Sequence, residues 1–422
     1  MAAMQTNAGC QGKADREQDV PDRFLYERES VSMKKVFFMD WKSFGNEDIL
    51  DAFAHRGDLN VIRYPFQNTD KRDDPEFEDH FSKDLQREAP DFVFSFNFYP
   101  LISKVCQKCS MKYVSWVYDN PHIALYSYTL INSCNYIFLF DYQMYAHFAA
   151  QGIKTVHYLP LAASVRRLDA MQPGKKEQVQ YGAKVSFVGA MYTEAHTFYD
   201  RMEPKLDDYT KGYLQGIMNA QMQIDGMNFV EECLSQTVLD GMMKELPAPP
   251  NADGVETSAY IYAQYMINRK ITSTERTQII RQIGEKYPVK LYTKDRAYTA
   301  PGVMNCGQID YYDTMPYVFK CSAINLNITL RSIQKGIPLR AYDIMGCGGF
   351  LLTNFQEDFL RFFVPGEDFV YYESRQDMME KIGYYLQHEE ERRQIAECAH
   401  HKIELDHTYD IRVSQMLEMI GE

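Results

Sequence analysis

The sequence predicts an α/β protein of two domains, each a parallel sheet covered by helices, with a helical insertion in the second domain. Short apolar runs alternate with amphipathic stretches from Lys34 onward, and this pattern resumes after a polar stretch at 173–176. Such alternation is typical of parallel sheets flanked by helices. Strand patterns are missing from 196–286, which predicts the insertion. The 422 residues, 45% of them hydrophobic, can bury two cores of ordinary domain size.

The first half of the chain contains six predicted strands, separated by five predicted helices. The strands are expected at 35–39, 60–63, 91–96, 112–117, 136–140 and 155–159. The helices are expected at 47–55, 75–87, 100–109, 122–131 and 142–151. After the linker at 173–176, further strands are expected at 185–189, 289–293, 323–328, 349–353 and 368–372, the last followed by three helices.

Polar residues follow several strands of the first half, where ligands meet the carboxyl ends of strands in such folds. Asp119 and His122 belong to the densest group, and they lie three residues apart. A carboxylate and an imidazole at this spacing could position and deprotonate an acceptor hydroxyl. The same Asp-Asn-Pro-containing segment is also typical of a turn that starts a helix. The residues alone leave both interpretations open.

A short helix that begins at Pro338 is the most informative feature of the second half. Proline suits the first helical turn, but the preceding Ile337 cannot cap the free backbone N–H groups. These groups, preceded by Gly336, could bind a phosphate. The alternative is that water or Ser332 satisfies them.

Arg340 and Asp343 lie three residues apart and therefore share a face of this helix. A cation and a carboxylate in this arrangement suit a nucleotide, with the arginine on a phosphate and the aspartate on ribose hydroxyls. An ordinary surface ion pair is the alternative.

Composition excludes several classes of protein. The net charge of -13, with a pI near 5.3 and no basic cluster, argues against nucleic-acid binding. No apolar run approaches the roughly 18 residues of a membrane-spanning helix. Nine scattered cysteines without a signal peptide favour reduced thiols and a cytoplasmic location, and residues 1–32 are expected to be a flexible extension. The sequence contains no P-loop, no G-x-G-x-x-G and no serine nucleophile elbow.

Motifs of the second half resemble the nucleotide-sugar domain of CgeB-like glycosyltransferases, a branch of the two-Rossmann-domain (GT-B) group. The residues that carry this resemblance are Gly336, Pro338, Leu339, Arg340, Asp343, Gly346 and the run 348–354, continued by 363–366, 384–386, 407–409 and Arg412. In the first half, 95–98, 115–117 and 119–121 are similar to the accompanying N-terminal domain. The resemblance covers most of 33–417, and it implies an acceptor-side domain at 33–172, a nucleotide-sugar domain at 173–406 and a C-terminal helix at 407–422 that crosses back.

The resemblance implies a glycosyltransferase with a cleft between the two domains, which transfers a hexose or N-acetylhexosamine from a nucleotide diphosphate sugar, expected to be UDP-linked. The acceptor is expected to be a hydroxyl of a protein, polysaccharide or other glycan. No metal and no cofactor are expected besides the nucleotide sugar as co-substrate. The donor-binding residues implied are Gly189, Arg331, Ser332, Gly336, Pro338, Arg340 and Asp343. The acceptor-side residues expected, from their places after strands of the first half, are Asp40, Asn97 and Asn120.

The stereochemistry of transfer stays open. Related retaining enzymes carry two glutamates separated by seven residues, and the equivalent positions here hold Lys335 and Asp343. A lysine cannot replace a carboxylate that contacts the sugar. An inverting displacement with Asp119 or His122 as catalytic base is therefore a hypothesis.

Two other functions are compatible with the same architecture. A nucleotide-sugar epimerase would change the donor without an acceptor. A non-catalytic sugar-nucleotide-binding or scaffold protein would bind without turnover, and the insertion at 196–286 would then be the site for a protein partner. The insertion could equally help an active enzyme to select its acceptor.

Overall fold

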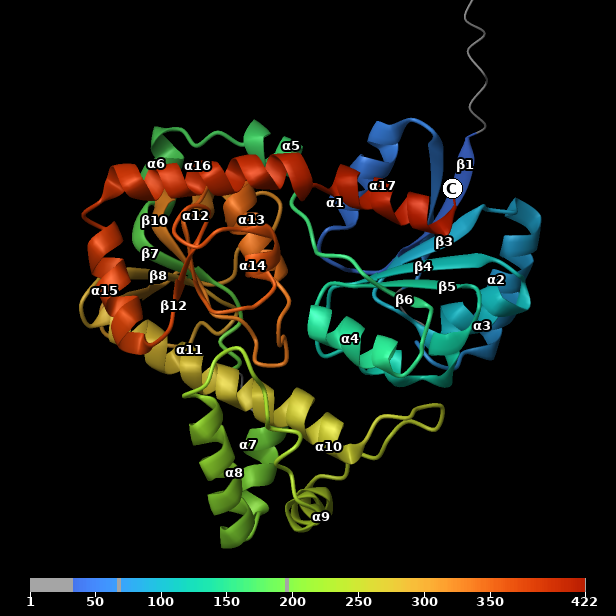
Figure 1. The fold of residues 1–422 in the computed structure, drawn as a ribbon, viewed down its shortest axis with the longest axis horizontal. Helices are drawn as coiled ribbons and strands as arrows, with labels where there is room; N and C mark the ends of the chain where they lie inside the picture. The colour runs from blue at the N-terminus through green and yellow to red at the C-terminus, as the bar shows by residue number, and fades with distance from the viewer. Residues whose placement is uncertain (1–32, 67–69, 194–196, 422) are drawn as a thin grey trace, which may run out of the picture. The chain divides into compact units, whose positions relative to one another are not determined.

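The structure is a computed structural model that describes residues 33–66, 70–193 and 197–421. The extension predicted at 1–32 lies outside the described residues. Two separate six-stranded sheets, parallel throughout, form the framework (Figure 1). The predicted fold class is confirmed.

The N-terminal sheet is built from β1 (Lys34–Asp40), β2 (Leu59–Pro65), β3 (Phe92–Phe96), β4 (Lys112–Val117), β5 (Asn135–Leu139) and β6 (Val156–Tyr158). Their order across the sheet is β2-β1-β3-β4-β5-β6. The helices of this half are α1 (Asn46–Arg56), α2 (Pro75–Glu88), α3 (Pro100–Lys108) and α4 (Tyr142–Ala150), with short 3-10 helices at Ile123–Tyr126 and Tyr128–Ile131. All five residues of β3 are buried, as expected for a central strand that helices cover on both faces.

The C-terminal sheet is built from β7 (Ala183–Val188), β8 (Val289–Tyr292), β9 (Val303–Asn305), β10 (Ser322–Asn327), β11 (Leu351–Asn354) and β12 (Val370–Tyr372). Their order is β12-β11-β10-β7-β8-β9. The chain reaches β7 from the N-terminal half through α5 (Val165–Ala170) and α6 (Lys175–Tyr181). The helices that join and follow the strands are α12 (Met315–Cys321), α13 (Leu339–Gly346), α14 (Phe359–Phe362), α15 (Arg375–Tyr385), α16 (Glu389–Asp406) and α17 (Tyr409–Ile420).

A helical segment separates β7 from β8, as the sequence predicts. It contains α7 (Phe198–Met202), a 3-10 turn at Glu203–Lys205, α8 (Asp208–Gln221), α9 (Gln236–Glu245), α10 (Ser258–Ile261), a π-helical turn at Tyr262–Ile267 and α11 (Asn268–Gly284). Its own buried cluster includes Met218, Val230 and Met242. Met218 and Met242 therefore contribute to packing, whereas Met227 is exposed.

Each predicted strand is found, with ends that differ by at most two residues, but three other expectations need correction. The helix predicted at 122–131 is two 3-10 helices, because Ser127 between them is extended and pairs with Gly254 of the insertion. The edge strand β9 was not predicted, since its three residues are too short to give a pattern. The linker predicted at 173–176 runs into α6.

Helix α17 lies against the N-terminal sheet rather than the C-terminal one (Figure 1). Tyr409 packs edge-on against Trp116 of β4, with ring centroids 5.7 Å apart. At the other end of the helix, Lys112 Nζ donates a hydrogen bond to the carbonyl oxygen of Ile420 (3.0 Å). The last helix thus ties the end of the chain to its first half.

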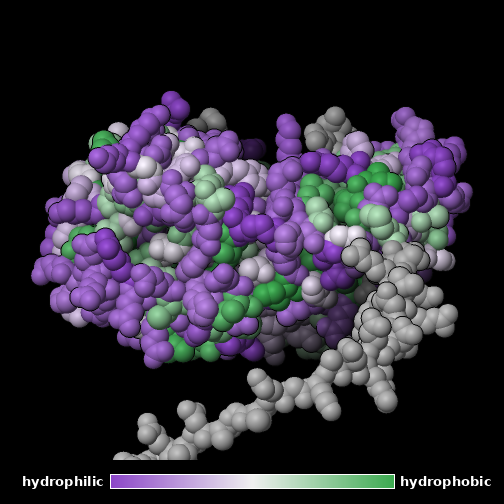
Figure 2. All heavy atoms as spheres, turned by 90° about the horizontal axis from the view of Figure 1, so that it is seen from above, coloured by the Kyte–Doolittle hydropathy of each residue, from purple (hydrophilic) through white to green (hydrophobic). Residues whose placement is uncertain are grey.

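The face covered by α16 and α17 is mainly hydrophilic, with hydrophobic atoms gathered in smaller patches (Figure 2). In the described part of the chain, no helix combines the length and the apolar character needed to cross a membrane.

Candidate functional site

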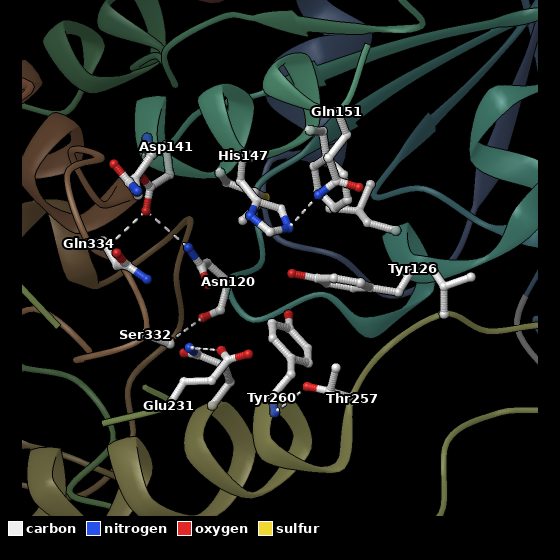
Figure 3. Close-up of a pocket in the computed structure, with 16 residues that line it drawn as sticks. Asn120, Tyr126, Asp141, His147, Gln151, Glu231, Thr257, Tyr260, Ser332 and Gln334 are labelled. Carbon is white, nitrogen blue, oxygen red and sulfur yellow. Dashed lines mark hydrogen bonds between the residues drawn. The ribbon is translucent and has the colours of Figure 1, made fainter. Parts of the chain in front are cut away.

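A cavity of about 370 Å³ lies where the carboxyl ends of the N-terminal strands meet the insertion and the loop before α13. The N-terminal half contributes Asn120, Tyr126, Asp141 and His147 (Figure 3). The insertion contributes Glu231, Thr257, Tyr260 and Gln264, and the loop after β10 contributes Ser332 and Gln334. The volume is in the range of small-molecule sites, and the mixture of aromatic rings with a few polar groups is typical of them.

Asp141 joins the two halves at one end of this cavity (Figure 3). It follows β5 and caps α4 by accepting a hydrogen bond from Gln143 N (2.9 Å). It also accepts from Gln334 N (2.8 Å) and Lys335 N (3.3 Å) of the C-terminal half, and from Asn120 Nδ2 (3.0 Å). Burial raises the pKa of this carboxyl to about 6 although these donors oppose the shift. The carboxylate therefore takes the backbone donors of the loop that leads into α13.

Gly336 lies directly against Asp141. A Cβ at this glycine would come within 2.8 Å of Asp141 Cα and 2.9 Å of the Phe140 ring. The close approach of these two loops explains the glycine without any ligand, because a side chain would force them apart.

Gly336→Ala should lower the free energy of unfolding by about 1–3 kcal/mol, the usual cost of overpacking. Urea denaturation would measure the change. Gly216→Ala is the control, since a Cβ at this α8 glycine meets no atom within 4 Å. Equal stability of the Gly336 variant and the wild type would contradict the expected clash.

Asp343 and Arg340 belong to a second cluster. The carboxyl of Asp343 is 3% exposed, accepts a hydrogen bond from the Tyr311 hydroxyl (2.9 Å) and lies 3.4 Å from Arg340 Nη1. Burial raises its pKa to about 6. Arg340 also contacts Met315 and the Phe319 ring. In this conformation Tyr311 covers the carboxylate that the sequence assigns to ribose.

Tyr311 is itself held from the N-terminal half. The guanidinium of Arg167 lies over the Tyr311 and Tyr312 rings and donates to both carboxylate oxygens of Asp48 at 2.7 and 3.0 Å. The Tyr312 hydroxyl accepts a hydrogen bond from Gly45 N (3.1 Å) at the start of α1. A continuous set of contacts therefore connects α1 with α13.

The other predicted donor residues are dispersed. Arg331 forms ion pairs with Glu275 and with Asp225, whose Oδ1 lies 2.8 Å from Arg331 Nη1. Ser332 donates to the carbonyl oxygen of Asn120 (2.8 Å) at the cavity. Gly189 N donates to Tyr292 O (3.0 Å) at the carboxyl edge of the sheet. The donor role of these residues stays a prediction.

The first turn of α13 has no side-chain cap. Pro338 is the N-cap residue rather than the first helical residue, and no side chain hydrogen bonds to the turn. Ser332 does not fill this place, because its hydroxyl is directed to Asn120. Of the first-turn N–H groups, that of Ala341 donates to the carbonyl oxygen of Pro338 (2.9 Å), so the predicted phosphate site would rely on those of Leu339 and Arg340.

The predicted pair Asp119 and His122 lies next to the cavity rather than lining it, with Asp119 exposed and His122 half-buried. Asp119 accepts from Asn97 Nδ2 (2.7 Å), and His122 Nε2 lies 2.7 Å from the carbonyl oxygen of Phe98. Desolvation by the surrounding protein raises the pKa of Asp119 and lowers that of His122. Asp40 pairs with Arg63 (3.0 Å) at the sheet edge. Of the predicted acceptor-side residues, Asn120 is the one that lines the cavity.

Sequence reasoning missed the cavity residues Tyr126, His147, Glu231 and Tyr260. Tyr126 and His147 had a weak signal, because each lies shortly after a strand end. Glu231 and Tyr260 had none, since they belong to the insertion and reach the cavity through tertiary packing. Across the described ranges, no group of three or more His, Cys, Asp or Glu side chains is placed to hold a metal ion.

Comparisons with known proteins agree with this architecture. Residues 273–418 match the protein family described as Glycosyl transferase-like. No curated protein matches the chain. The matched segment includes β10, α13 and β11, the part of the chain that carries Arg340 and Asp343.

Solved structures with the same fold include glycosyltransferases. HepE from Anabaena in complex with UDP-glucose is 11% identical, with a TM-score of 0.53 over 92% of this chain and 99% of HepE. A glycosyltransferase from Rickettsia africae is 8% identical, with a TM-score of 0.52 over 92% and 97% of the two chains. The N-terminal domain of Candida albicans trehalose-6-phosphate phosphatase is 10% identical, with a TM-score of 0.53 over 92% and 97%. The chain has the GT-B fold.

Proposed function

We propose that this protein is a glycosyltransferase that moves a hexose or N-acetylhexosamine from a UDP-linked sugar to a hydroxyl of a protein, polysaccharide or other glycan. The single observation that carries the proposal is the glycosyl transferase-like segment at 273–418, which contains the uncapped α13 and the Arg340–Asp343 pair. The GT-B neighbour HepE, solved with UDP-glucose, supports the choice of nucleotide.

In the proposed complex, the donor diphosphate meets the backbone N–H groups at the start of α13 together with Arg340. The ribose hydroxyls meet Asp343 once Tyr311 has moved aside. Helix N-termini favour anions, and an arginine adds charge-assisted hydrogen bonds to phosphate. The acceptor enters the neighbouring cavity. Transfer is proposed to need no metal, so activity should survive EDTA.

Nucleotide binding tests the proposal most directly. The protein would be titrated with UDP, GDP and dTDP sugars by calorimetry, and the products analysed by mass spectrometry. Transfer to glycan acceptors is expected. Binding to none of the nucleotides would refute the donor assignment. Conversion of the donor alone would indicate the epimerase, and binding without turnover under any acceptor would indicate a scaffold protein.

Arg340→Ala should weaken UDP binding by about 10- to 100-fold, since a hydrogen bond to a charged group contributes about 1.5–3 kcal/mol. Arg393→Ala is the control, because Arg393 is an exposed arginine of the same half, on α16. Unchanged UDP affinity in the Arg340 variant would remove this residue from the donor site.

A further inference from the structure

Besides the phenols Tyr126 and Tyr260, three titratable side chains line the cavity: Asp141, His147 and Glu231. Four hydrogen-bond donors already engage the carboxylate of Asp141. His147 is exposed, and its Nε2 lies 3.0 Å from Gln151 Nε2. Glu231 keeps accepting capacity, because Gln264 (Nε2 to Oε2, 3.3 Å) and Thr257 donate to a carboxylate that has about four acceptor sites.

The loop that carries Glu231 is firmly placed. Its neighbour Val230 is completely buried in the core of the insertion. Asn228 donates through Nδ2 to the carbonyl oxygen of Arg331 (2.8 Å) and to Asn268 Oδ1 (3.0 Å). The backbone of Arg331 belongs to the loop between β10 and α13, so Glu231 is fixed relative to the element that is proposed to hold the donor.

The surroundings of Glu231 suit proton transfer. Burial raises the pKa of its carboxyl, against the opposing influence of Gln264, His147 and Thr257. The other titratable groups coupled to it are Glu232 of the same loop and the phenols Tyr126 and Tyr260. A carboxylate with a raised pKa is a stronger base at neutral pH than an exposed one.

We propose that Glu231 is the catalytic base of the transfer and that the acceptor it serves is a sugar hydroxyl held in the cavity. This inference rests on the proposed function. Glu231 takes the proton of the acceptor hydroxyl, and the acceptor oxygen forms a bond to C1 of the donor sugar. The bond from C1 to the diphosphate oxygen breaks, and its electron pair leaves with UDP. Such a single displacement inverts the configuration at C1.

The lining of the cavity identifies the acceptor class. Tyr126 of the N-terminal half and Tyr260 of the insertion pack against one another, with ring centroids 4.3 Å apart and planes tilted by 47°, and together form an aromatic part of the cavity lining that also carries two hydroxyls (Figure 3). The amides of Asn120, Gln143 and Gln264 add donors and acceptors nearby. Aromatic faces combined with convergent neutral polar groups suit a pyranose, which has apolar C–H faces and a rim of hydroxyls. The insertion thereby forms the acceptor wall.

Glu231→Gln and Glu232→Gln are the matched variants that test this inference, since Glu232 is the exposed neighbour outside the cavity lining. UDP release from UDP-glucose would be measured with water alone and with a panel of methyl glycosides. Glu231→Gln should lower kcat by about 100- to 1,000-fold, the usual effect of removing a general base. UDP affinity by calorimetry should stay within about twofold of wild type, and Glu232→Gln should behave as wild type.

The pH profile gives a second readout. In the wild type, kcat/KM should fall as the pH decreases through the raised pKa of Glu231, because the base must be ionised. This acid limb should be lost in Glu231→Gln.

Turnover of Glu231→Gln within threefold of Glu232→Gln would overturn the base assignment and leave the proposed function intact. A joint loss of UDP affinity and turnover would also overturn it, since Glu231 would then be structural. Failure of wild-type protein to bind UDP, or to release UDP from both UDP-glucose and UDP-N-acetylglucosamine, would overturn the proposed function and this inference together.

Discussion

Asp48→Ala should lower the free energy of unfolding by about 3–5 kcal/mol, the effect of breaking a buried ion pair from one side. The Asp48 side chain is 2% exposed and accepts both hydrogen bonds of the Arg167 guanidinium. Arg167 Nη1 already has no hydrogen-bond partner, and removal of Asp48 would leave the guanidinium without its hydrogen-bonded carboxylate. Chemical denaturation at neutral pH would measure the loss.

The chain contains a matched control for this prediction. Arg166 and Asp51 form an ion pair between the same two helices, α5 and α1, but their side chains are 42% and 54% exposed. Exposed pairs contribute about 0–1 kcal/mol, so Asp51→Ala should have a small effect. Equal losses in the two variants would show that burial does not govern the Asp48 contact.

The fold was predictable because its signals are local. The strands β1, β3, β4 and β5 of the N-terminal sheet contain short apolar runs, and β3 illustrates why such a run predicts a central strand, since all five of its side chains are buried. The region 122–131 was mispredicted because its conformation depends on Gly254, more than 100 residues later in the sequence. Such a pairing leaves no mark on the local pattern.

The site was only partly predictable for the same reason. The proximity of Arg340 and Asp343 follows from helical spacing. That Tyr311 donates to Asp343, or that Asp141 accepts from Gln334 N, depends on how separate loops meet. The sequence predicted an anion site at the start of α13. In the structure, Asp141 already accepts hydrogen bonds from the backbone N–H groups of Gln334 and Lys335, in the loop before this helix.

Asp343→Asn should gain stability over the wild type as the pH rises. The difference in free energy of unfolding, variant minus wild type, should be about 3 kcal/mol larger at pH 7.5 than at pH 4. Burial raises the pKa of Asp343 from the ordinary 3.8 to about 6. A carboxyl whose pKa is raised by folding adds stability that is complete below about pH 4 and is lost as the pH rises through 6. A shift of about two pKa units corresponds to about 3 kcal/mol. The asparagine stays neutral and keeps an acceptor for the Tyr311 hydroxyl, so it avoids this loss.

Urea denaturation of both proteins at pH 4 and pH 7.5 would measure the difference, with the exposed Asp313→Asn as control. The charged groups that act on Asp343 are Arg340, Arg167 and Asp48. A pH-independent difference between Asp343→Asn and the wild type would mean that the carboxyl titrates normally. If the expected difference is found, the ionised Asp343 carboxylate destabilises the protein without donor, because Tyr311 and Arg340 stabilise its charge only in part. Ribose hydroxyls in a donor complex would supply the hydrogen bonds that this carboxylate lacks.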